Sequence, residues 1–344
     1  MRFSAAAIAA ILAGFAMAHP GHDVKQEIAE RASFMSQLKT RDLSHCSAKL
    51  KARGLEQAAV ARRSAIAKSE RKKRGISSGA PYLRARDEAT VLNTTHLSSV
   101  NYNASTDESI IFSGNNSCIL SPEVTQGPYY VSGEYVRKDI VEDQEGVDLI
   151  LDTQVIDMAT CDPVTNAFVE IWHCNSTGVY SGIVASTNGN SADATNINST
   201  FLRGLQATDD EGVAQFQTLF PGHYTSRSNH IHVLVHFNGT IYANGTYGGG
   251  VISHVGQMFF DQDLITQVEA ISPYTTNRQP VTLNSEDSVL SDEAASSDPL
   301  IEYSLLGETV ADGIFGWLAF GVNISESYRV QPAASLYASG GVEN

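Results

Sequence analysis

Short strand-like runs separated by turn residues fill the chain from Cys118 onward, and they restrict the folds that are open to it. One run, residues 229–236 (NHIHVLVH), alternates polar and apolar side chains, as a strand with one buried face does. Short strands joined by long loops favour a β-sandwich over an α/β fold. The sequence therefore predicts a mainly β fold. The predicted strands lie at residues 147–157, 167–174, 213–218, 229–236, 251–260 and 316–322.

The predicted sandwich spans residues 118–325 and carries long loops, with residues 326–344 assigned to a C-terminal tail. Within it, residues 284–299 are acidic and rich in serine, a composition typical of a surface loop. Residues 75–117, rich in serine, threonine, asparagine and glycine, are expected to form a linker with little regular structure.

The first part of the chain has a helical pattern instead. Apolar residues recur at helical spacing between residues 24 and 73, so we expect a helical N-terminal region over residues 19–74. Gly54 is expected to separate two helices. A tetrabasic run, residues 71–74, is either a processing site or the solvated end of a helix.

Charge is distributed unevenly between these regions. Residues 1–90 hold 17 of the 23 lysines and arginines against 8 acids, whereas the rest of the chain holds 6 bases and 30 acids. The formal net charge of −15 makes a nucleic-acid partner unexpected. No apolar run of about 18 residues follows the first 20, so we expect no membrane-spanning helix.

The amino terminus has the features of a secretory signal peptide. Arg2 supplies a positive charge, an apolar stretch follows, and the small residues around Ala18 fit a cleavage site, so we assign residues 1–18 to the signal. N-x-S/T sequons support an extracellular glycoprotein. They begin at Asn93, Asn103, Asn115, Asn175, Asn198, Asn238, Asn244 and Asn323.

Four cysteines stand at positions 46, 118, 161 and 174. In an oxidising compartment we expect two disulfides among them. Cys161 lies in a turn and Cys174 ends the predicted strand that follows it, and a strand of that length is too long for a disulfide to bridge. Cys46 is therefore expected to pair with one of the other three, and the connectivity stays open.

His230 and His232 form the first chemical motif. Residues i and i+2 of a strand share one face, so both imidazoles can reach one metal ion, while Ile231 points to the other face. The turn Phe220–Tyr224 presents a tyrosine just upstream, and a Gly-x-Tyr sequence ends at Tyr180. These surroundings strengthen the case for a metal ion at the two histidines.

In order and spacing, these elements resemble the intradiol ring-cleavage dioxygenases, most closely their secreted fungal members. The resemblance covers about residues 118–265, with a looser match near 313–322. It rests on three segments, residues 118–130 (CILSPEVTQGPYY), 164–180 (VTNAFVEIWHCNSTGVY) and 221–233 (PGHYTSRSNHIHV).

The resemblance implies a non-haem Fe(III) centre held by Tyr180, Tyr224, His230 and His232. Phenolate is a hard anionic ligand that suits ferric iron, and two phenolates with one hydroxide balance its three charges. By motif position, Tyr224 is the ligand that substrate displaces. The resemblance also gives catalytic roles to Arg227 and Gln257 and places Gly127, Pro128 and Tyr129 beside the substrate.

The implied activity is cleavage of catechol-type rings between the two hydroxyl-bearing carbons, giving muconic-type diacids from an aromatic diol and O2. The alternative is a non-catalytic extracellular β-sandwich that binds metal. A further alternative is copper bound at a mature amino terminus beginning with His19. A hydrolase is not expected, because no Gly-x-Ser-x-Gly elbow is present. The N-terminal helices could also join two copies of the chain in a homodimer.

Overall fold

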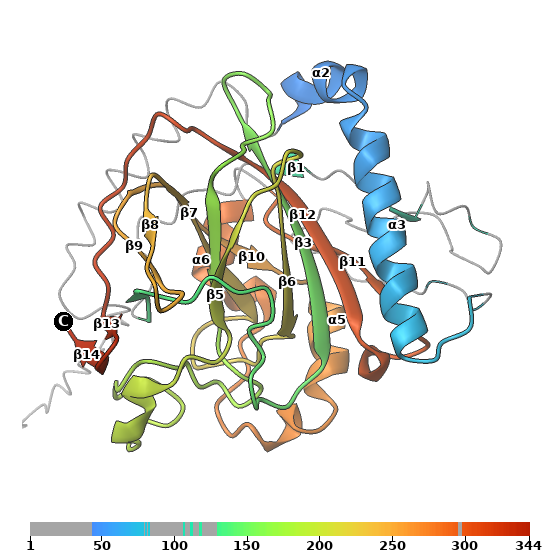
Figure 1. Cartoon of the computed structure of the whole chain (residues 1–344). Coiled ribbons are helices and arrows are strands. Elements are labelled where there is room, and N and C mark those ends of the chain that lie inside the picture. Colours follow the sequence, from blue (N-terminus) through green and yellow to red (C-terminus); the bar gives the residue numbers. More distant parts are fainter. Residues whose placement is uncertain are drawn as a thin grey trace, which may run out of the picture.

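A computed structural model describes residues 43–78, 80, 82, 106, 111–112, 117–118, 129–294 and 298–344. The predicted signal peptide, and Gly127 and Pro128 of the predicted substrate loop, lie outside these residues. Two β-sheets packed face to face form the body of the molecule, and one long helix covers the outside of the first sheet (Figure 1). The mainly β prediction is confirmed.

The first sheet has the order β1-β12-β3-β6, with β11 paired to β12 on a branch. Its long members, β3 and β12, run parallel to each other and are buried along nearly their whole length. Burial on both faces explains why the sequence of β12 is continuously apolar, whereas β3 also buries polar side chains such as Asp152 and Thr153. The strands are β1 (Ser117–Cys118), β3 (Asp148–Asp157), β6 (Val213–Leu219), β11 (Glu302–Leu305) and β12 (Ile314–Val322).

The second sheet is antiparallel and has the order β10-β7-β4-β5. Its inner face packs on the first sheet, while the outer face of β7 carries the histidines of the predicted metal motif. The strands are β4 (Phe168–Trp172), β5 (Arg203–Ala207), β7 (His230–Phe237) and β10 (Val251–Phe259). All six predicted strands are present, and the sequence analysis missed β5 and β11.

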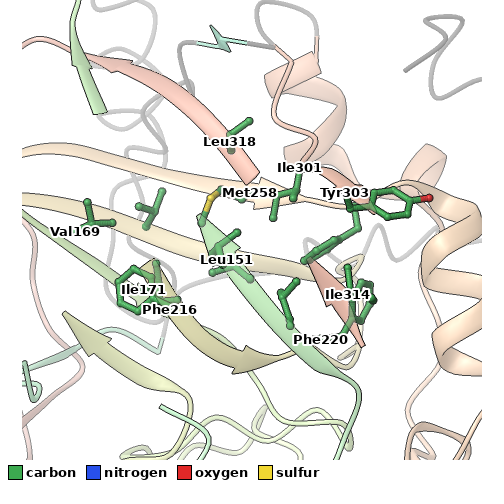
Figure 2. Packing of buried hydrophobic residues seen from close by; sticks show 14 of the residues in the cluster. Leu151, Val169, Ile171, Phe216, Phe220, Met258, Ile301, Tyr303, Ile314 and Leu318 are labelled. Atoms are coloured by element: carbon green, nitrogen blue, oxygen red, sulfur yellow. The ribbon is translucent and has the colours of Figure 1, made fainter. Parts of the chain in front are cut away.

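The main core lies between the two sheets (Figure 2). Alternate residues supply it: Ile231, Val233 and Val235 of β7 all point inward. Figure 2 shows Leu151 of β3 and Met258 of β10 meeting across this layer. Because inward residues of β7 alternate with outward ones, packing of this core also fixes the direction of His230 and His232.

Helix α3 (Leu55–Lys73) lies over the outer face of the first sheet (Figure 1). Arg62 donates two hydrogen bonds from its guanidinium to the buried carboxylate of Asp152 on β3, at 3.0 and 3.1 Å. Tyr82 and Phe112, which lie in the span expected to be a linker, are buried in the same apolar cluster. Arg71 of the tetrabasic run is also buried, so this residue is not part of a solvated helix end.

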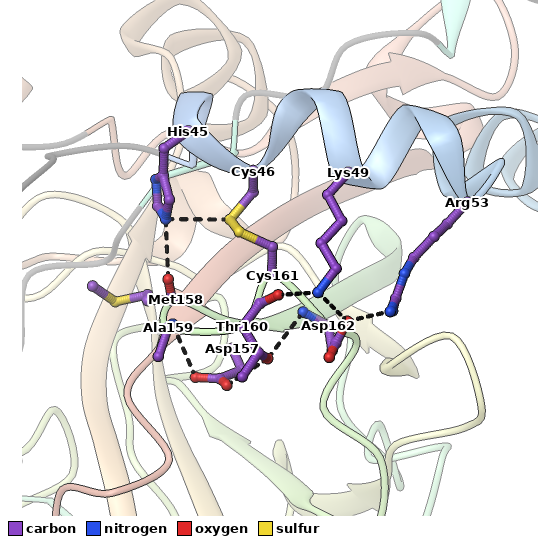
Figure 3. The surroundings of a disulfide bond; sticks show 10 residues. All are labelled: His45, Cys46, Lys49, Arg53, Asp157, Met158, Ala159, Thr160, Cys161 and Asp162. Carbon is purple, nitrogen blue, oxygen red and sulfur yellow. Dashed lines mark hydrogen bonds and ion pairs between the residues drawn. A yellow bond between two sulfur atoms is a disulfide. The ribbon is translucent and has the colours of Figure 1, made fainter.

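A short helical segment precedes α3 and is tied to the sandwich by a disulfide. The 3-10 helix η1 (Ser44–Cys46) leads into α2 (Ser47–Ala52), and Gly54, at φ 72°, separates α2 from α3 as predicted. Cys46 is bonded to Cys161 (Figure 3). Cys174 is a free, buried thiol, so the expectation of two disulfides is wrong.

The span 284–299 is not the surface loop that its composition predicts. It contains the 3-10 helix η4 (Asn284–Glu286) and helix α6 (Ser288–Ala294), with Asp287 and Leu290 fully buried. An acidic side chain with a distant buried partner cannot be distinguished from a solvated one by local composition. The remaining helices are η2 (Ala194–Asn198), α5 (Gln262–Glu269), η3 (Tyr274–Thr276) and η5 (Val310–Asp312).

The chain continues in regular structure beyond residue 325, where the sequence analysis begins a tail. Strands β13 (Ala334–Tyr337) and β14 (Gly340–Glu343) form a hairpin, and β13 pairs in parallel with β2 (Val131–Ser132). A further hairpin joins β8 (Thr240–Ile241) and β9 (Tyr247–Gly248). Within the part of the chain that the structure describes, no helix has the length and apolar character to span a bilayer.

Candidate metal centre and its surroundings

The four predicted metal ligands come from three elements that converge on the outer face of the second sheet. Tyr180 lies in the loop after β4, Tyr224 lies in the turn after β6, and His230 and His232 lie on β7. All four side chains are buried, Tyr180 completely and Tyr224 with 9% of its surface exposed. Residues up to 52 positions apart in sequence therefore meet in one buried cluster.

The potential ligand atoms lie at distances that one ion could bridge. The Nε2 atoms of His230 and His232 are 3.1 Å apart, and the Tyr224 hydroxyl lies 3.4 Å from His230 Nε2. Two ligands that are each about 2.1 Å from an ion, at right angles to one another, lie roughly 3 Å apart. The ring of Tyr180 lies 5.5 Å from that of Tyr224 and 6.0 Å from that of His232.

Backbone contacts prepare His230 for such a role. Its Nδ1 donates to the carbonyl oxygen of Ser228 at 2.6 Å, which leaves the lone pair on Nε2 directed at the cluster. Burial and the nearby Arg227 guanidinium lower the pKa of His230, so the imidazole stays neutral. Neutral imidazole is the form that binds a metal ion.

Two buried amides hold Tyr180 in place. Asn188 accepts a hydrogen bond from the Tyr180 backbone N–H and donates to its carbonyl oxygen, both at 2.8 Å, and Asn196 donates to the same oxygen at 2.8 Å. The Tyr180 hydroxyl has no hydrogen-bond partner among the described residues. Burial and the neighbouring Tyr224 raise the pKa of Tyr180 well above its usual value. A buried phenol without a hydrogen-bond partner is explained when an ion binds its oxygen.

A charged network lies next to the cluster. The Arg227 guanidinium donates from Nη2 to Gln257 and from Nε to the Asp287 carboxylate at 3.0 Å. Gln257 in turn lies 3.3 Å from His232 Nδ1. The structure thus brings together all three of the predicted catalytic residues, Arg227, Tyr224 and Gln257.

Asp287 is a residue of this network that sequence reasoning missed. It is fully buried at the start of α6, where Oδ1 accepts the backbone N–H groups of Val289 and Leu290. Its Oδ2 accepts from Arg227 and from both the N–H and hydroxyl of Ser228. Burial alone would raise the pKa of Asp287, but the Arg227 charge and the backbone N–H groups of Ser228 and Leu290 lower it below its usual value. Asp287 therefore fixes Arg227 as a paired, oriented cation.

Tyr129 of the predicted substrate loop is packed on the cluster. Its ring stacks on that of Tyr180 with centres 4.5 Å apart, and its hydroxyl donates to Thr187 at 2.8 Å. Thr187 and Asn188 belong to the loop between β4 and β5, which the sequence analysis did not place.

One row of directly opposed residues crosses the whole second sheet and contains His232. Arg203 on β5 faces Trp172 on β4, Trp172 faces His232 on β7, and His232 faces Gln257 on β10. Directly opposed residues of antiparallel strands share one face. The candidate ligand therefore lies in the middle of a cross-strand row that reaches from one edge of the sheet to the other.

The residues present fit a ferric ion. Two phenols that can lose their protons and two imidazoles form a hard donor set with the charge that Fe(III) favours, and the buried Tyr180 hydroxyl, which makes no hydrogen bond among the described residues, is available to bind an ion. Among the described residues, His45, Cys46 and Cys161 also form a group of three side chains of metal-binding types. Two of these are joined in the disulfide, so that cluster is not an alternative site.

Known proteins share this architecture. The intradiol ring-cleavage dioxygenase from Tetranychus urticae is 31% identical in sequence, with a TM-score of 0.50, and the match covers 98% of that chain and 62% of this one. The chain belongs to the intradiol ring-cleavage dioxygenase family. A family model described as "Dioxygenase" also matches residues 125–285, a span that contains the candidate metal centre.

Curated relatives give the same family but match a shorter span. The catechol 1,2-dioxygenase of Acinetobacter baylyi is 34% identical over 110 residues, and that of Pseudomonas sp. strain EST1001 is 35% identical over 109 residues. Each alignment covers 30% of this chain, which spans about a third (32%) of the length of each relative. The helical region at residues 44–73 lies outside the family model.

Proposed function

We propose that the protein is a non-haem Fe(III) dioxygenase that cleaves catechol-type rings between the two hydroxyl-bearing carbons to give muconic-type diacids. One observation carries the proposal: two buried tyrosines and two buried histidines, remote in sequence, lie in one cluster, where the His230 and His232 Nε2 atoms are 3.1 Å apart and the Tyr224 hydroxyl is 3.4 Å from His230 Nε2. Membership of the intradiol family supports the same reading.

Tyr180, Tyr224, His230 and His232 would hold the iron, which when bound supplies Lewis-acid polarisation and a template for the diol. The two tyrosines have different freedom to move. Tyr180 is fully buried, and two asparagines hold its backbone. Tyr224 retains some exposure and lies in a turn next to the exposed Thr225. Tyr224 is therefore the tyrosine that would leave its place, and its phenolate oxygen would accept a hydroxyl proton from the diol.

The other residues orient the diol and stabilise charge. Arg227, held by Asp287, presents a fixed cation beside the cluster, where it stabilises negative charge that develops on the ring. Gln257 ties Arg227 to His232, so the cation and the ligand keep one relative position. Tyr129, stacked on Tyr180, forms one wall beside the reacting ring.

Oxygen uptake with a panel of catechols and hydroxyquinols tests this function. We expect the purified wild-type protein to contain iron, to be red-brown from tyrosinate-to-iron charge transfer, and to consume O2 with at least one diol. Tyr224→Phe should lose most of the activity, and Tyr180→Phe should lose colour and iron together. Tyr337→Phe, an exposed tyrosine on β13, is the matched control and should behave as wild type.

The alternative is a non-catalytic metal-binding β-sandwich. A protein that binds iron, is colourless and consumes no O2 with any diol of the panel would favour it. Copper bound at His19 is distinguished by metal analysis, since truncation of the first residues of the mature chain would then release the metal.

We also propose that the chain is secreted after removal of residues 1–18 and carries N-linked glycans. Amino-terminal sequencing of protein recovered from the medium should begin at His19. A glycan on Asn175 would break the hydrogen bond that its Nδ2 donates to Gln144 at 2.8 Å, so we expect this sequon to be unoccupied in the folded protein. A homodimer through the N-terminal helices stays a prediction, which sedimentation of the full chain tests.

A further inference from the structure

The buried guanidinium of Arg203 belongs to the same cross-strand row as the candidate ligand His232, and the proposed chemistry gives it no role. Arg203 opens strand β5 and has 1% of its surface exposed. A charged group is rarely buried this deeply unless its donors are used and its charge is balanced.

The Nε and Nη2 donors of Arg203 bind two loops that carry site residues. Nε donates to the carbonyl oxygen and hydroxyl of Ser181 at 3.0 and 2.9 Å. Nη2 donates to the same carbonyl oxygen and to that of Tyr129, both at 2.7 Å. Ser181 directly follows Tyr180 in the chain, so one side chain joins the loop of a candidate ligand to the loop beside the substrate.

The two loops also meet through their rings. Tyr129 and Tyr180 stack with centres 4.5 Å apart, and the Arg203 guanidinium carbon lies 6.0 Å from the centre of the Tyr180 ring. A cation near an aromatic ring favours electron density on that ring. The nearest acidic side chain is the buried Glu134, whose oxygen lies 3.7 Å from Nη1, and burial raises the pKa of this carboxyl to about 8.

We propose that Arg203 is a positioning residue of the metal centre, which fixes Tyr180 relative to Tyr129 through their backbones. This inference rests on the proposed function and deepens it. The planar guanidinium is needed because it offers several donors in one fixed plane to acceptors on two chain segments, whereas a lysine offers a single flexible ammonium.

Arg203→Lys tests the proposal, because it keeps the positive charge and removes the planar set of hydrogen-bond donors. We expect iron affinity, measured by competition with a chelator, to fall about 10- to 100-fold, as is usual when support for a metal ligand is lost. The charge-transfer band of the remaining iron-loaded protein should shift. Near-ultraviolet circular dichroism of the metal-free protein should report altered packing of Tyr129 and Tyr180.

Glu134→Gln is the matched control. It removes the ion-pair partner of Arg203 but none of the acceptors on Ser181 and Tyr129. Iron affinity and the band should therefore stay within about twofold of wild type, well short of the loss expected for Arg203→Lys. The proposal is wrong if Arg203→Lys folds with wild-type affinity and band, or if Glu134→Gln reproduces its defects.

If Arg203→Lys fails to fold, Ser181→Ala tests the proposal instead. It removes one hydrogen bond of Arg203, the 2.9 Å bond from Nε to the Ser181 hydroxyl, and leaves its bonds to the carbonyl oxygens of Ser181 and Tyr129. A shifted band in a folded protein supports the proposal, and an unchanged band overturns it. Wild-type protein that shows no iron band at all would instead contradict the proposed function.

Discussion

The indole of Trp172 lies parallel to the imidazole of His232, with ring centres 4.7 Å apart and planes inclined by 3°. The two residues face each other directly across strands β4 and β7. A flat contact of this kind restrains rotation of the imidazole, so Trp172 sets the plane in which His232 can bind an ion.

Trp172→Leu should therefore weaken iron binding by roughly tenfold, because the His232 ring gains freedom to rotate. It should also lower the free energy of unfolding by about 3 kcal/mol through loss of buried volume. Chelator competition and urea unfolding measure the two effects.

Trp317→Leu is the matched control, because Trp317 is equally buried but lies under α3, away from the centre. It should lose comparable stability and keep its iron affinity. Equal losses of iron affinity in both variants would mean that the stacking contact has no particular effect on the site.

Asp287→Asn should impair turnover more than it impairs binding of iron. Arg227 would lose its charged partner at 3.0 Å, and the cation would no longer be held beside the ring. We expect kcat to fall about 10- to 100-fold. Removing one member of a buried ion pair should also reduce the free energy of unfolding by about 3 kcal/mol.

The control for this substitution is Asp152→Asn, which breaks a second buried carboxylate–arginine pair on the far sheet. It should destabilise the protein to a similar degree while kcat stays near the wild-type value. Similar kcat values for the two variants would contradict a role of Asp287 in turnover.

Buried neutral histidines predict loss of stability in mild acid. Burial lowers the pKa of His254 to about 3 and that of His173 to about 4, against about 6.5 in an unfolded chain. Below pH ~6.5 the unfolded chain takes up protons first, so stability falls as pH falls, by about 1.4 kcal/mol per pH unit for each histidine.

His254→Phe removes one of these contributions. The difference in unfolding free energy between wild type and variant should change by about 2 kcal/mol between pH 6.5 and 5, in favour of the variant. Parallel curves for His254→Phe would show that this histidine does not titrate between the two states.

The cross-link between Cys46 and Cys161 closes a loop of 115 residues. A loop of that length restricts the unfolded chain, so Cys46→Ala should lower the free energy of unfolding by about 4 to 5 kcal/mol. Reductant should lower the melting temperature of wild type and have no effect on Cys46→Ala. Cys174→Ala, which removes the free thiol, should keep the reductant sensitivity of wild type.

Much of the sheet structure could be predicted from local pattern, and the reason is visible in β7. Ile231, Val233 and Val235 enter the core, so the alternation in sequence is the alternation of the pleat. The same alternation placed His230 and His232 on one face. The turn that presents Tyr224 was recognisable because it lies only six residues from His230.

The parts that could not be predicted depend on partners far away in sequence. Asp287 is 60 residues from Arg227, and the acidic, serine-rich segment around it has the composition of a solvated loop. Arg203 is 74 residues from Tyr129, and a lone arginine beside a glycine carries no local signal. The four cysteines predicted two disulfides, but Cys174 is a free thiol that donates a hydrogen bond to the Gly222 carbonyl oxygen.

The parallel pairing of β13 with β2 joins Ala334 to Val131, two residues after Tyr129. During synthesis on the ribosome, the amino-terminal strand of this pair leaves the exit tunnel about 200 residues before its partner does, which at typical elongation rates is an interval of roughly 10 to 40 s. Sheet completion beside Tyr129 therefore has to wait until β13 has also left the tunnel, so the surroundings of Tyr129 are completed late in folding.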